Sequence, residues 1–204
     1  MSAPLALNLD GYTDLPPGHI ASVVTFLEMR APPAVANTPL PGAALTRLGA
    51  PDEPRYTAIY RTLGERWVWF SRLSLTAGDR AEIIGRPAVE AYAVSLNGED
   101  AGLLELDFRQ PGAAELAFFG LYEKAIGTGA ARWLMDRALE RAFAHESVRR
   151  FWVHTCTFDH PRAVDFYRRC GFAPYRSALE VVPDPRLNGL LPRGAAPHVP
   201  VIGV

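Results

Sequence analysis

The sequence has little cysteine, no long apolar run and no excess of basic residues. Its 204 residues include two cysteines, Cys156 and Cys170, which do not form a C-x-x-C motif, so neither a disulfide framework nor a zinc site is expected. No apolar run reaches the roughly 18 residues that a membrane-spanning helix needs. The formal net charge of −1 argues against a nucleic-acid partner and against a surface that binds anionic membranes.

The first residues also lack the pattern of a secretory signal. Residues 1–10 carry no positive charge ahead of their apolar residues, whereas a signal peptide begins with a charged region. Together with the scarcity of cysteine, this pattern predicts a cytoplasmic protein. The sequence contains no cluster of His, Cys, Asp and Glu with metal-ligand spacing, so no metal is expected.

What the chain does have is the composition of a globular domain. Hydrophobic residues make up 49% and charged residues 21%, which is ordinary for a protein with a buried core. A chain of 204 residues suffices for one such domain. We therefore expect one domain over residues 1–182, with its core motifs at 88–182. Residues 183–204 are rich in proline and glycine and are expected to form an extended tail.

The first half of the chain contains one strand pattern and two helical patterns. Residues 22–30 are apolar and β-branched and predict a strand, whereas residues 31–41 contain four prolines and predict a loop. Apolar residues recur at helical spacing over residues 52–63, which predicts a helix ended by Gly64. Residues 76–84 predict a second, short helix.

The second half changes from consecutive strands to alternating strands and helices. The expected strands are 89–96, 101–108, 114–121, 151–157 and 178–182, and the expected helices are 130–144 and a helix from Pro161 to the glycine at 171. Asn97-Gly98 is a strong hairpin signal between the first two strands. The fold class that follows is a mixed α/β domain. Its central sheet is antiparallel in the first part, gains one parallel crossover later and is flanked by helices.

Small residues fill the junction between the strand at 114–121 and the following helix. This junction reads Ile126-Gly127-Thr128-Gly129-Ala130-Ala131. A helix N-terminus attracts anions through its free N–H groups, and glycine lets a phosphate approach the backbone closely. The alternative is a tight turn whose glycines serve packing alone. The chain has no G-x-x-x-x-G-K-S/T motif and no G-x-G-x-x-G motif here, so two known nucleotide loops do not apply.

Two segments resemble conserved blocks of the GNAT N-acetyltransferases. AELAFFGLYEKAIGTGAARWLMDRALERA is similar to the strand, pyrophosphate loop and helix of that family, whose Q/R-x-x-G-x-G/A pattern fits residues 126–131. HPRAVDFYRRCGF, residues 160–172, is similar to the family's N-x-x-A-x-x-x-Y-x-x-x-G-F helix. The N-terminal part also resembles bacterial GNAT proteins of unassigned substrate. Two departures are Ile126, where the family has Gln or Arg, and His160, where it has Asn.

The resemblance implies the GNAT fold and an acetyl-CoA-dependent N-acetyltransferase. Such an enzyme transfers the acetyl group directly to a primary amine of a small molecule or peptide in a ternary complex. A homodimer is compatible with the family, and nothing in the sequence decides it. By the same resemblance, backbone groups of the strand before the loop stabilise the oxyanion and admit the pantetheine arm. The expected cofactor-binding residues are Phe119, Gly120, Leu121, Ile126, Gly127, Thr128, Gly129, Ala130, Ala131 and His160. At Gly120, a glycine that only serves packing is the alternative.

Amide formation requires a base, because an alkyl ammonium with a pKa of about 10.4 is protonated at neutral pH. Glu115 is the candidate, since the AELAFFGL segment matches the strand on which many GNAT enzymes carry a catalytic Glu. A solvent-facing strand glutamate is the alternative. Glu105 and Asp107 on the neighbouring strand are fallback candidates. In some other relatives the base lies on the later strand, at the position that Thr155 occupies here. The threonine argues against a base at that position.

Tyr167 is the candidate general acid. The resemblance directs its hydroxyl toward the sulfur of CoA, and a neutral phenol can donate a proton or a hydrogen bond to a developing thiolate. A tyrosine that only packs beside Ala163 is the alternative.

Other chemically suggestive residues have simpler interpretations. Cys156 and Cys170 are expected as small core residues, although His154 lies on the same strand face as Cys156. Trp69 and its aromatic neighbours can wall a substrate pocket or belong to the core. Two rival functions remain: a CoA-binding module without turnover, motivated by His160, and transfer of a longer acyl group into space near Phe118 and Phe119.

Overall fold

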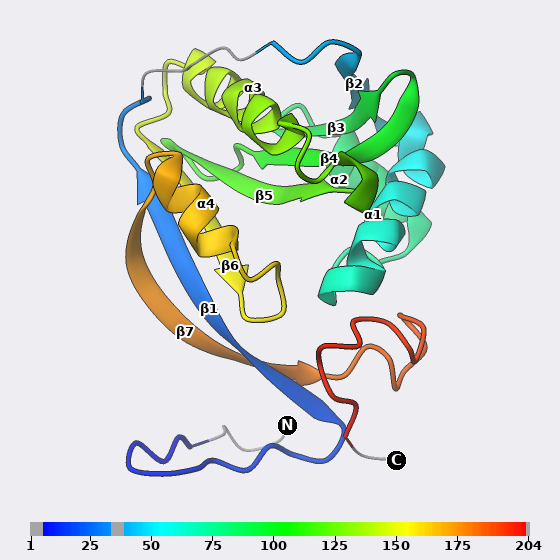
Figure 1. Cartoon of the computed structure of the whole chain (residues 1–204), viewed down its shortest axis with the longest axis vertical. Coiled ribbons are helices and arrows are strands. Elements are labelled where there is room, and N and C mark those ends of the chain that lie inside the picture. The colour runs from blue at the N-terminus through cyan, green and yellow to red at the C-terminus, as the bar shows by residue number, and fades with distance from the viewer. Residues whose placement is uncertain (1–5, 34–38, 203–204) are drawn as a thin grey trace.

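A computed structural model describes residues 6–33 and 39–202, in which helices cover both faces of a seven-stranded sheet (Figure 1). The strands lie in the order β2-β3-β4-β5-β6-β1-β7. They are β1 His19–Met29, β2 Ala43–Leu48, β3 Val89–Leu96, β4 Glu99–Asp107, β5 Ala113–Leu121, β6 Arg150–Cys156 and β7 Ala173–Pro183. The helices are α1 Glu53–Trp67, α2 Ala77–Gly85, α3 Ala130–Ala144 and α4 Ala163–Arg169, with short 3-10 helices η1 Ala50–Asp52 and η2 Glu123–Ala125.

The sheet is mixed, which confirms the predicted fold class. β2, β3, β4 and β5 pair antiparallel in sequence order. Asn97 and Gly98 connect β3 to β4 with φ angles of 52° and 84°, the left-handed values that a two-residue hairpin turn requires. β5 and β6 pair in parallel, and α3 makes the crossover between them. The strand, loop and helix that were expected to form the anion site are therefore consecutive elements.

The N-terminal strand completes the sheet on the far side of β6. β1 lies between β6 and β7 and pairs antiparallel with both, so Val24 is opposite Cys156 on one side and Ala178 on the other. Figure 1 shows β1 and β7 as a long pair that extends past the end of β6. The first and last strands of the chain thus form one edge of the sheet.

The two faces of the sheet have separate hydrophobic clusters. Side chains of a strand alternate between faces, and on β4 Leu103 packs with Tyr56 and Tyr60 of α1, whereas Leu104 packs with Leu134 of α3. α1 and α2 therefore cover one face, and α3 and α4 cover the other. We refer to these as the α1 face and the α3 face.

The structure differs from the sequence-based predictions in two elements of the first half. β2 was not predicted; the expected loop at 31–41 lies partly outside the described residues, which exclude 34–38. α1 continues past Gly64 to Trp67 and ends at Val68, whose φ is 59°. Gly64 has a packing role, because a Cβ atom there would collide with the carbonyl oxygen of Trp69. The prediction that Gly64 ends this helix was wrong.

Later elements match more closely. α3 has the predicted bounds, and α2 begins after Thr76, whose hydroxyl accepts a hydrogen bond from the Asp79 N–H at 3.1 Å. α4 begins at Ala163 and not at the predicted Pro161. β7 is longer than the predicted 178–182 because it follows β1 along most of its length.

Residues 184–202 fold back against α1. A buried Arg186 donates to Asp184 at 2.9 Å and to main-chain carbonyls later in the same segment. The Ala196 N–H donates to the Glu65 carbonyl of α1 at 2.7 Å. This segment therefore belongs to the core cluster of the α1 face. Within the ranges 6–33 and 39–202, no helix is long and apolar enough to cross a membrane.

Candidate functional site

β5 and β6 stop pairing partway along their length. Their parallel register covers Ala113 to Glu115 on β5 opposite Arg150 to Trp152 on β6, and both strands continue beyond it. The later part of β5 still pairs with β4 on its other side. We call residues 116–121 of β5 the free edge, because the side of this stretch that faces β6 has no strand partner in the described part of the chain.

The free edge directs two backbone N–H groups toward β6. The Tyr122 N–H donates to the Ala101 carbonyl of β4 at 2.8 Å. Because the direction of N–H groups alternates along a strand, the Gly120 N–H also points toward β4, whereas those of Phe119 and Leu121 point toward β6. Phe119 and Leu121, and not Gly120, are thus the available donors among the three predicted residues.

The predicted phosphate loop lies between η2 and α3. Gly127 and Gly129 have φ angles of 82° and 90°, values that other residues rarely adopt. A Cβ atom built on either glycine meets no atom within 4 Å, so the space in front of the loop is open. Gly129 precedes the first turn of α3, and the early N–H groups of a helix have no partner within it. Successive N–H groups in such a turn form an anion-binding concavity.

The other predicted loop residues do not contribute equally. The Ile126 N–H already donates to the Glu123 carbonyl at 3.0 Å, and its side chain is 46% exposed. The Thr128 hydroxyl donates to the Ala125 carbonyl at 2.8 Å and so closes the turn. Ala130 is fully buried, where it packs on Ala125. Ile126 is therefore not available as a main-chain donor, and Ala130 fixes the helix against the sheet.

Tyr167 lies on the α3 face, beside the free edge. Its ring packs against Phe119 and Phe172, with centroid distances of 6.2 Å and 5.8 Å. Burial, together with the nearby Asp159 carboxylate, raises the pKa of Tyr167 well above its ordinary value. The phenol therefore keeps its proton at neutral pH and is able to donate a hydrogen bond.

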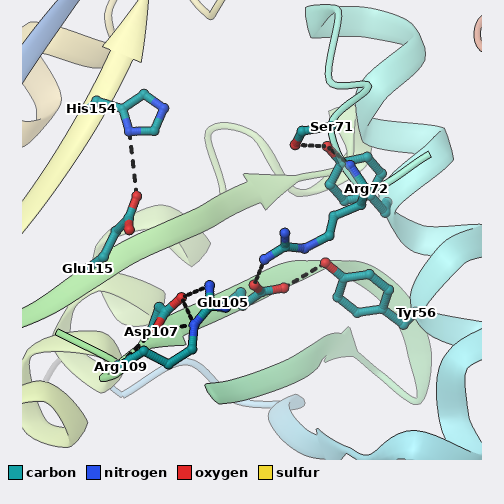
Figure 2. A network of polar contacts seen from close by, with 9 residues as sticks. Tyr56, Ser71, Arg72, Glu105, Asp107, Arg109, Glu115 and His154 are labelled. Carbon is teal, nitrogen blue, oxygen red and sulfur yellow. Dashed lines mark hydrogen bonds and ion pairs between the residues drawn. The ribbon is translucent and has the colours of Figure 1, made fainter. Parts of the chain in front are cut away.

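Glu115 lies on the α1 face, at the point where β5 and β6 separate. It is opposite Trp152, and His154 follows two residues later on the same face of β6. His154 Nδ1 is 3.6 Å from Glu115 Oε1, and Figure 2 shows the two side chains pointing toward each other from adjacent strands. The Glu115 carboxylate raises the pKa of His154 although burial opposes the shift. Sequence patterns had related His154 to Cys156 and missed this pair.

A hollow of about 320 Å³ adjoins Glu115. Its lining residues are Asp107, Arg109, Gln110, Glu115 and Trp152. Burial opposes the shift, but hydrogen bonds from Arg109 hold the pKa of Asp107 below its ordinary value, so this fallback base is an ion-pair partner. Glu115 is thus the carboxylate of this hollow that faces a histidine.

Glu105, the other fallback base, is fully buried and has structural partners. Its carboxylate accepts hydrogen bonds from the Tyr56 hydroxyl at 2.6 Å and from Arg72 at 2.5 Å. Figure 2 shows it between these two side chains. Because a buried carboxylate needs such partners, Glu105 connects β4 to α1 and to the loop after α1.

Tyr56→Phe is expected to lower the free energy of unfolding by about 2 kcal/mol, the range for a hydrogen bond to a charged group. Tyr60→Phe is the matched control, since Tyr60 is equally buried one turn later and its hydroxyl meets only neutral groups, the Ser71 hydroxyl at 3.2 Å and the Arg72 backbone N–H at 3.3 Å. The control should lose about 1 kcal/mol. Urea unfolding measures both, and equal losses would contradict a special role for the Glu105 contact.

His160, expected to bind the cofactor, lies in the turn before α4. Its Nδ1 accepts a hydrogen bond from the Arg162 N–H at 3.1 Å, and its ring lies 5.5 Å from that of Trp67. The residue therefore caps the turn before α4 and leaves the other ring nitrogen, Nε2, as the donor of the neutral imidazole.

Cys170 belongs to the core cluster of the α3 face, and Cys156 is half-buried. Burial raises the pKa of Cys156 to about 11, with a further contribution from Asp159, and burial also raises the pKa of Cys170. Neither thiol is therefore activated as a nucleophile. Among residues 6–33 and 39–202, no group of three or more His, Cys, Asp or Glu side chains is arranged to hold a metal ion.

A sequence model described as the acetyltransferase (GNAT) family matches residues 56–172, more than half of the chain. No curated protein sequence matches the chain.

Three solved structures share the fold. A functionally unknown conserved protein from Staphylococcus epidermidis has a TM-score of 0.63 at 13% identity, over 82% of this chain and 63% of that one. A GCN5-related N-acetyltransferase from Kribbella flavida has a TM-score of 0.55 at 18% identity, over 84% and 63%. The chain thus spans less than two thirds of the length of both. An aminoglycoside acetyltransferase from an uncultured soil sample, solved with sisomicin, has a TM-score of 0.53 at 12% identity, over 64% and 88%.

Proposed function

Because the chain belongs to the acetyltransferase (GNAT) family, we propose that it transfers an acetyl group from acetyl-CoA to a primary amine. The observation that carries this proposal is the relation between three neighbouring features. An open glycine loop at the start of α3 follows the free edge of β5, and Glu115 with His154 lies where that edge begins. The candidates for a phosphate site, for main-chain donors and for a base thus follow one another along β5.

The residues present suit CoA as the acyl carrier. Gly127 to Ala131 offer the main-chain N–H groups of a helix N-terminus to the pyrophosphate. The free edge of β5, on the side toward β6, is unpaired and is available to an extended pantetheine arm. The N–H groups of Phe119 and Leu121 are the candidate donors to the thioester oxygen, because preorganised donors stabilise the charge that develops there.

The Glu115–His154 pair is the proposed base. The acceptor arrives as an ammonium ion and loses a proton to this pair. Its nitrogen then forms a bond to the thioester carbon, and the carbon–sulfur bond breaks as the intermediate collapses. A second proton passes from the nitrogen to solvent, the departing thiolate takes up one proton from solvent, and the pair then releases its proton to solvent. One proton is therefore released overall.

Tyr167 is proposed to donate a hydrogen bond to the departing sulfur. Its raised pKa makes complete transfer of the phenolic proton to a thiolate unfavourable, because a thiol has a pKa of about 8.5. A hydrogen bond requires no such transfer and becomes stronger as negative charge develops on the sulfur. Tyr167 therefore lowers the barrier to carbon–sulfur cleavage.

The proposed acceptors are cationic amines of small molecules or peptides. The hollow beside Glu115 is lined by Glu115, by Asp107 with its ion-pair partner Arg109, and by Trp152. Because Asp107 is already paired, Glu115 and Trp152 are the groups that favour an ammonium ion, through charge and cation–π contact. The sisomicin-bound structure with the same fold supports including an aminoglycoside among the amines tested.

The test is release of free thiol from acetyl-CoA in the presence of sisomicin, spermidine and a lysine-containing peptide, with the wild-type protein and Tyr167→Phe. We expect turnover with at least one amine and a fall in kcat of about tenfold in the variant, the worth of one hydrogen bond to a charged group. Acetyl-CoA binding without turnover would instead favour a CoA-binding module. Absence of binding would contradict both.

A further inference from the structure

One aromatic side chain contacts both sides of the region where β5 and β6 separate. Trp69, in the loop between α1 and α2, donates a hydrogen bond from Nε1 to Asp159 Oδ1 at 3.0 Å. Asp159 follows the end of β6. At the other end of the same indole, a Cβ atom built on Gly120 of β5 would lie 2.8 Å from Trp69 Cη2. The indole thus spans from the free edge to the residues after β6, on the α1 face.

The position of this indole is fixed from several directions. Its ring packs against Phe118 and Tyr60, with centroid distances of 5.4 Å and 5.9 Å. The Trp69 N–H donates to the Gly64 carbonyl of α1 at 3.2 Å. The close approach of the two backbones at Gly64 explains why this helix tolerates a glycine in its last turn.

The partner of the indole nitrogen is fixed as well. The other carboxylate oxygen of Asp159 accepts hydrogen bonds from the Thr155 hydroxyl at 2.7 Å and from the Cys156 N–H at 2.9 Å. A charge-assisted hydrogen bond to an anchored carboxylate costs more to break than one to water. Displacing Trp69 therefore requires breaking this bond and separating packed aromatic rings.

We propose that Trp69 limits the acyl donor to short chains, acetyl or propionyl, by filling the space over Gly120. This inference rests on the proposed function, because it takes the thioester to lie beside Phe119 and Leu121. The proposed base is on the α1 face, so the acyl carbon must be reachable from that face. An acyl chain extending there from the free edge meets the benzene ring of Trp69, whose Cη2 lies only 2.8 Å from the position of a Cβ atom on Gly120.

The test is calorimetric titration of CoA, acetyl-CoA and hexanoyl-CoA into the wild-type protein and Trp69→Ala. No acceptor amine is needed. The wild-type protein should bind hexanoyl-CoA at least tenfold more weakly than acetyl-CoA. In Trp69→Ala the affinity for hexanoyl-CoA should rise at least tenfold, while the affinity for CoA itself changes less than threefold. Trp69→Phe, which keeps a ring and loses the hydrogen bond to Asp159, should give an intermediate gain and serves if the alanine variant does not fold.

Trp67→Ala is the matched control, since it removes an indole two residues away that contacts His160 and not Gly120. It should leave the ratio of hexanoyl-CoA to acetyl-CoA affinity unchanged. Equal binding of the two donors by the wild-type protein, or an unchanged ratio in both Trp69 variants, would overturn the role of Trp69 while leaving the proposed function intact. Failure of the wild-type protein to bind CoA at all would overturn both.

Discussion

Gly129→Glu is expected to weaken acetyl-CoA binding by at least about 100-fold, which corresponds to about 2.7 kcal/mol. Two effects add at this position. The residue has a φ of 90°, and a side chain with a Cβ atom is disfavoured in this conformation by about 1–2 kcal/mol. The new carboxylate also lies in the open space before α3, where it would occupy the position of a phosphate and repel its charge. Isothermal titration measures the dissociation constant.

The chain offers a close control for this variant. Gly189 has a φ of 80°, and a Cβ atom there also meets no atom within 4 Å. It lies in the C-terminal segment, away from the loop. Gly189→Glu therefore carries the same charge and a similar backbone strain, and it should bind acetyl-CoA within about threefold of the wild-type protein. Equal weakening in both variants would mean that the effect is general destabilisation, and unchanged binding in Gly129→Glu would remove the loop from the site.

The elements that local patterns define were predictable from the sequence. The helix at 130–144 has an uninterrupted apolar stripe and begins after a glycine, so its bounds agree with the structure. The β3–β4 hairpin follows from Asn97-Gly98, which fixes the turn by its own backbone preference. Both features depend on residues near in sequence, and the loop between β5 and α3 was located for the same reason.

Features that depend on distant segments were not predictable in this way. The place of β1 between β6 and β7 is set by pairing with strands more than a hundred residues later, and no local pattern encodes it. The end of α1 was misplaced because Gly64 reads locally as a helix stop, whereas in the structure it admits the backbone of Trp69. The Trp69–Asp159 contact joins two loops and had no sequence signal.

The candidate site also combines residues that local motifs predict with a residue that only the pairing of distant strands brings to the site. Glu115 and Tyr167 were selected from motifs, and the structure locates them on opposite faces of the sheet. Glu115 lies where the free edge begins, and Tyr167 packs against Phe119 within it. The sequence did not predict His154 as the partner of Glu115, because only the parallel register of β5 and β6 reveals this pair. A one-residue shift in that register would direct the His154 side chain to the other face. The Glu115–His154 pair therefore depends on how β5 and β6 pair in the sheet.

Glu115→Gln is expected to lower kcat/KM for an amine acceptor by about 100-fold, the lower end of the range for general base catalysis. The variant keeps the size and hydrogen-bonding capacity of the side chain and removes its charge. The measurement is kcat/KM for the wild-type protein and the variant with one acceptor, from about pH 5.5 to about 9. Glu90→Gln is the matched control, because Glu90 forms a similar pair with His145 at 3.3 Å, on β3. It should retain activity within about twofold.

The pH profile identifies the group that titrates. Only the deprotonated His154–Glu115 pair can accept a proton, so activity rises with pH through the apparent pKa of the pair. The Glu115 carboxylate raises the pKa of His154; removing its charge lowers this pKa, and the acidic limb of the profile should move to lower pH. The ionisation of the acceptor amine also shapes the profile, but it is the same for both proteins and cancels in the comparison. The loss of activity should therefore be largest above the pKa of the wild-type pair and smaller below it. An acidic limb at the same pH in both proteins would contradict the pairing, because the titrating group would then be one that the Glu115 charge does not reach.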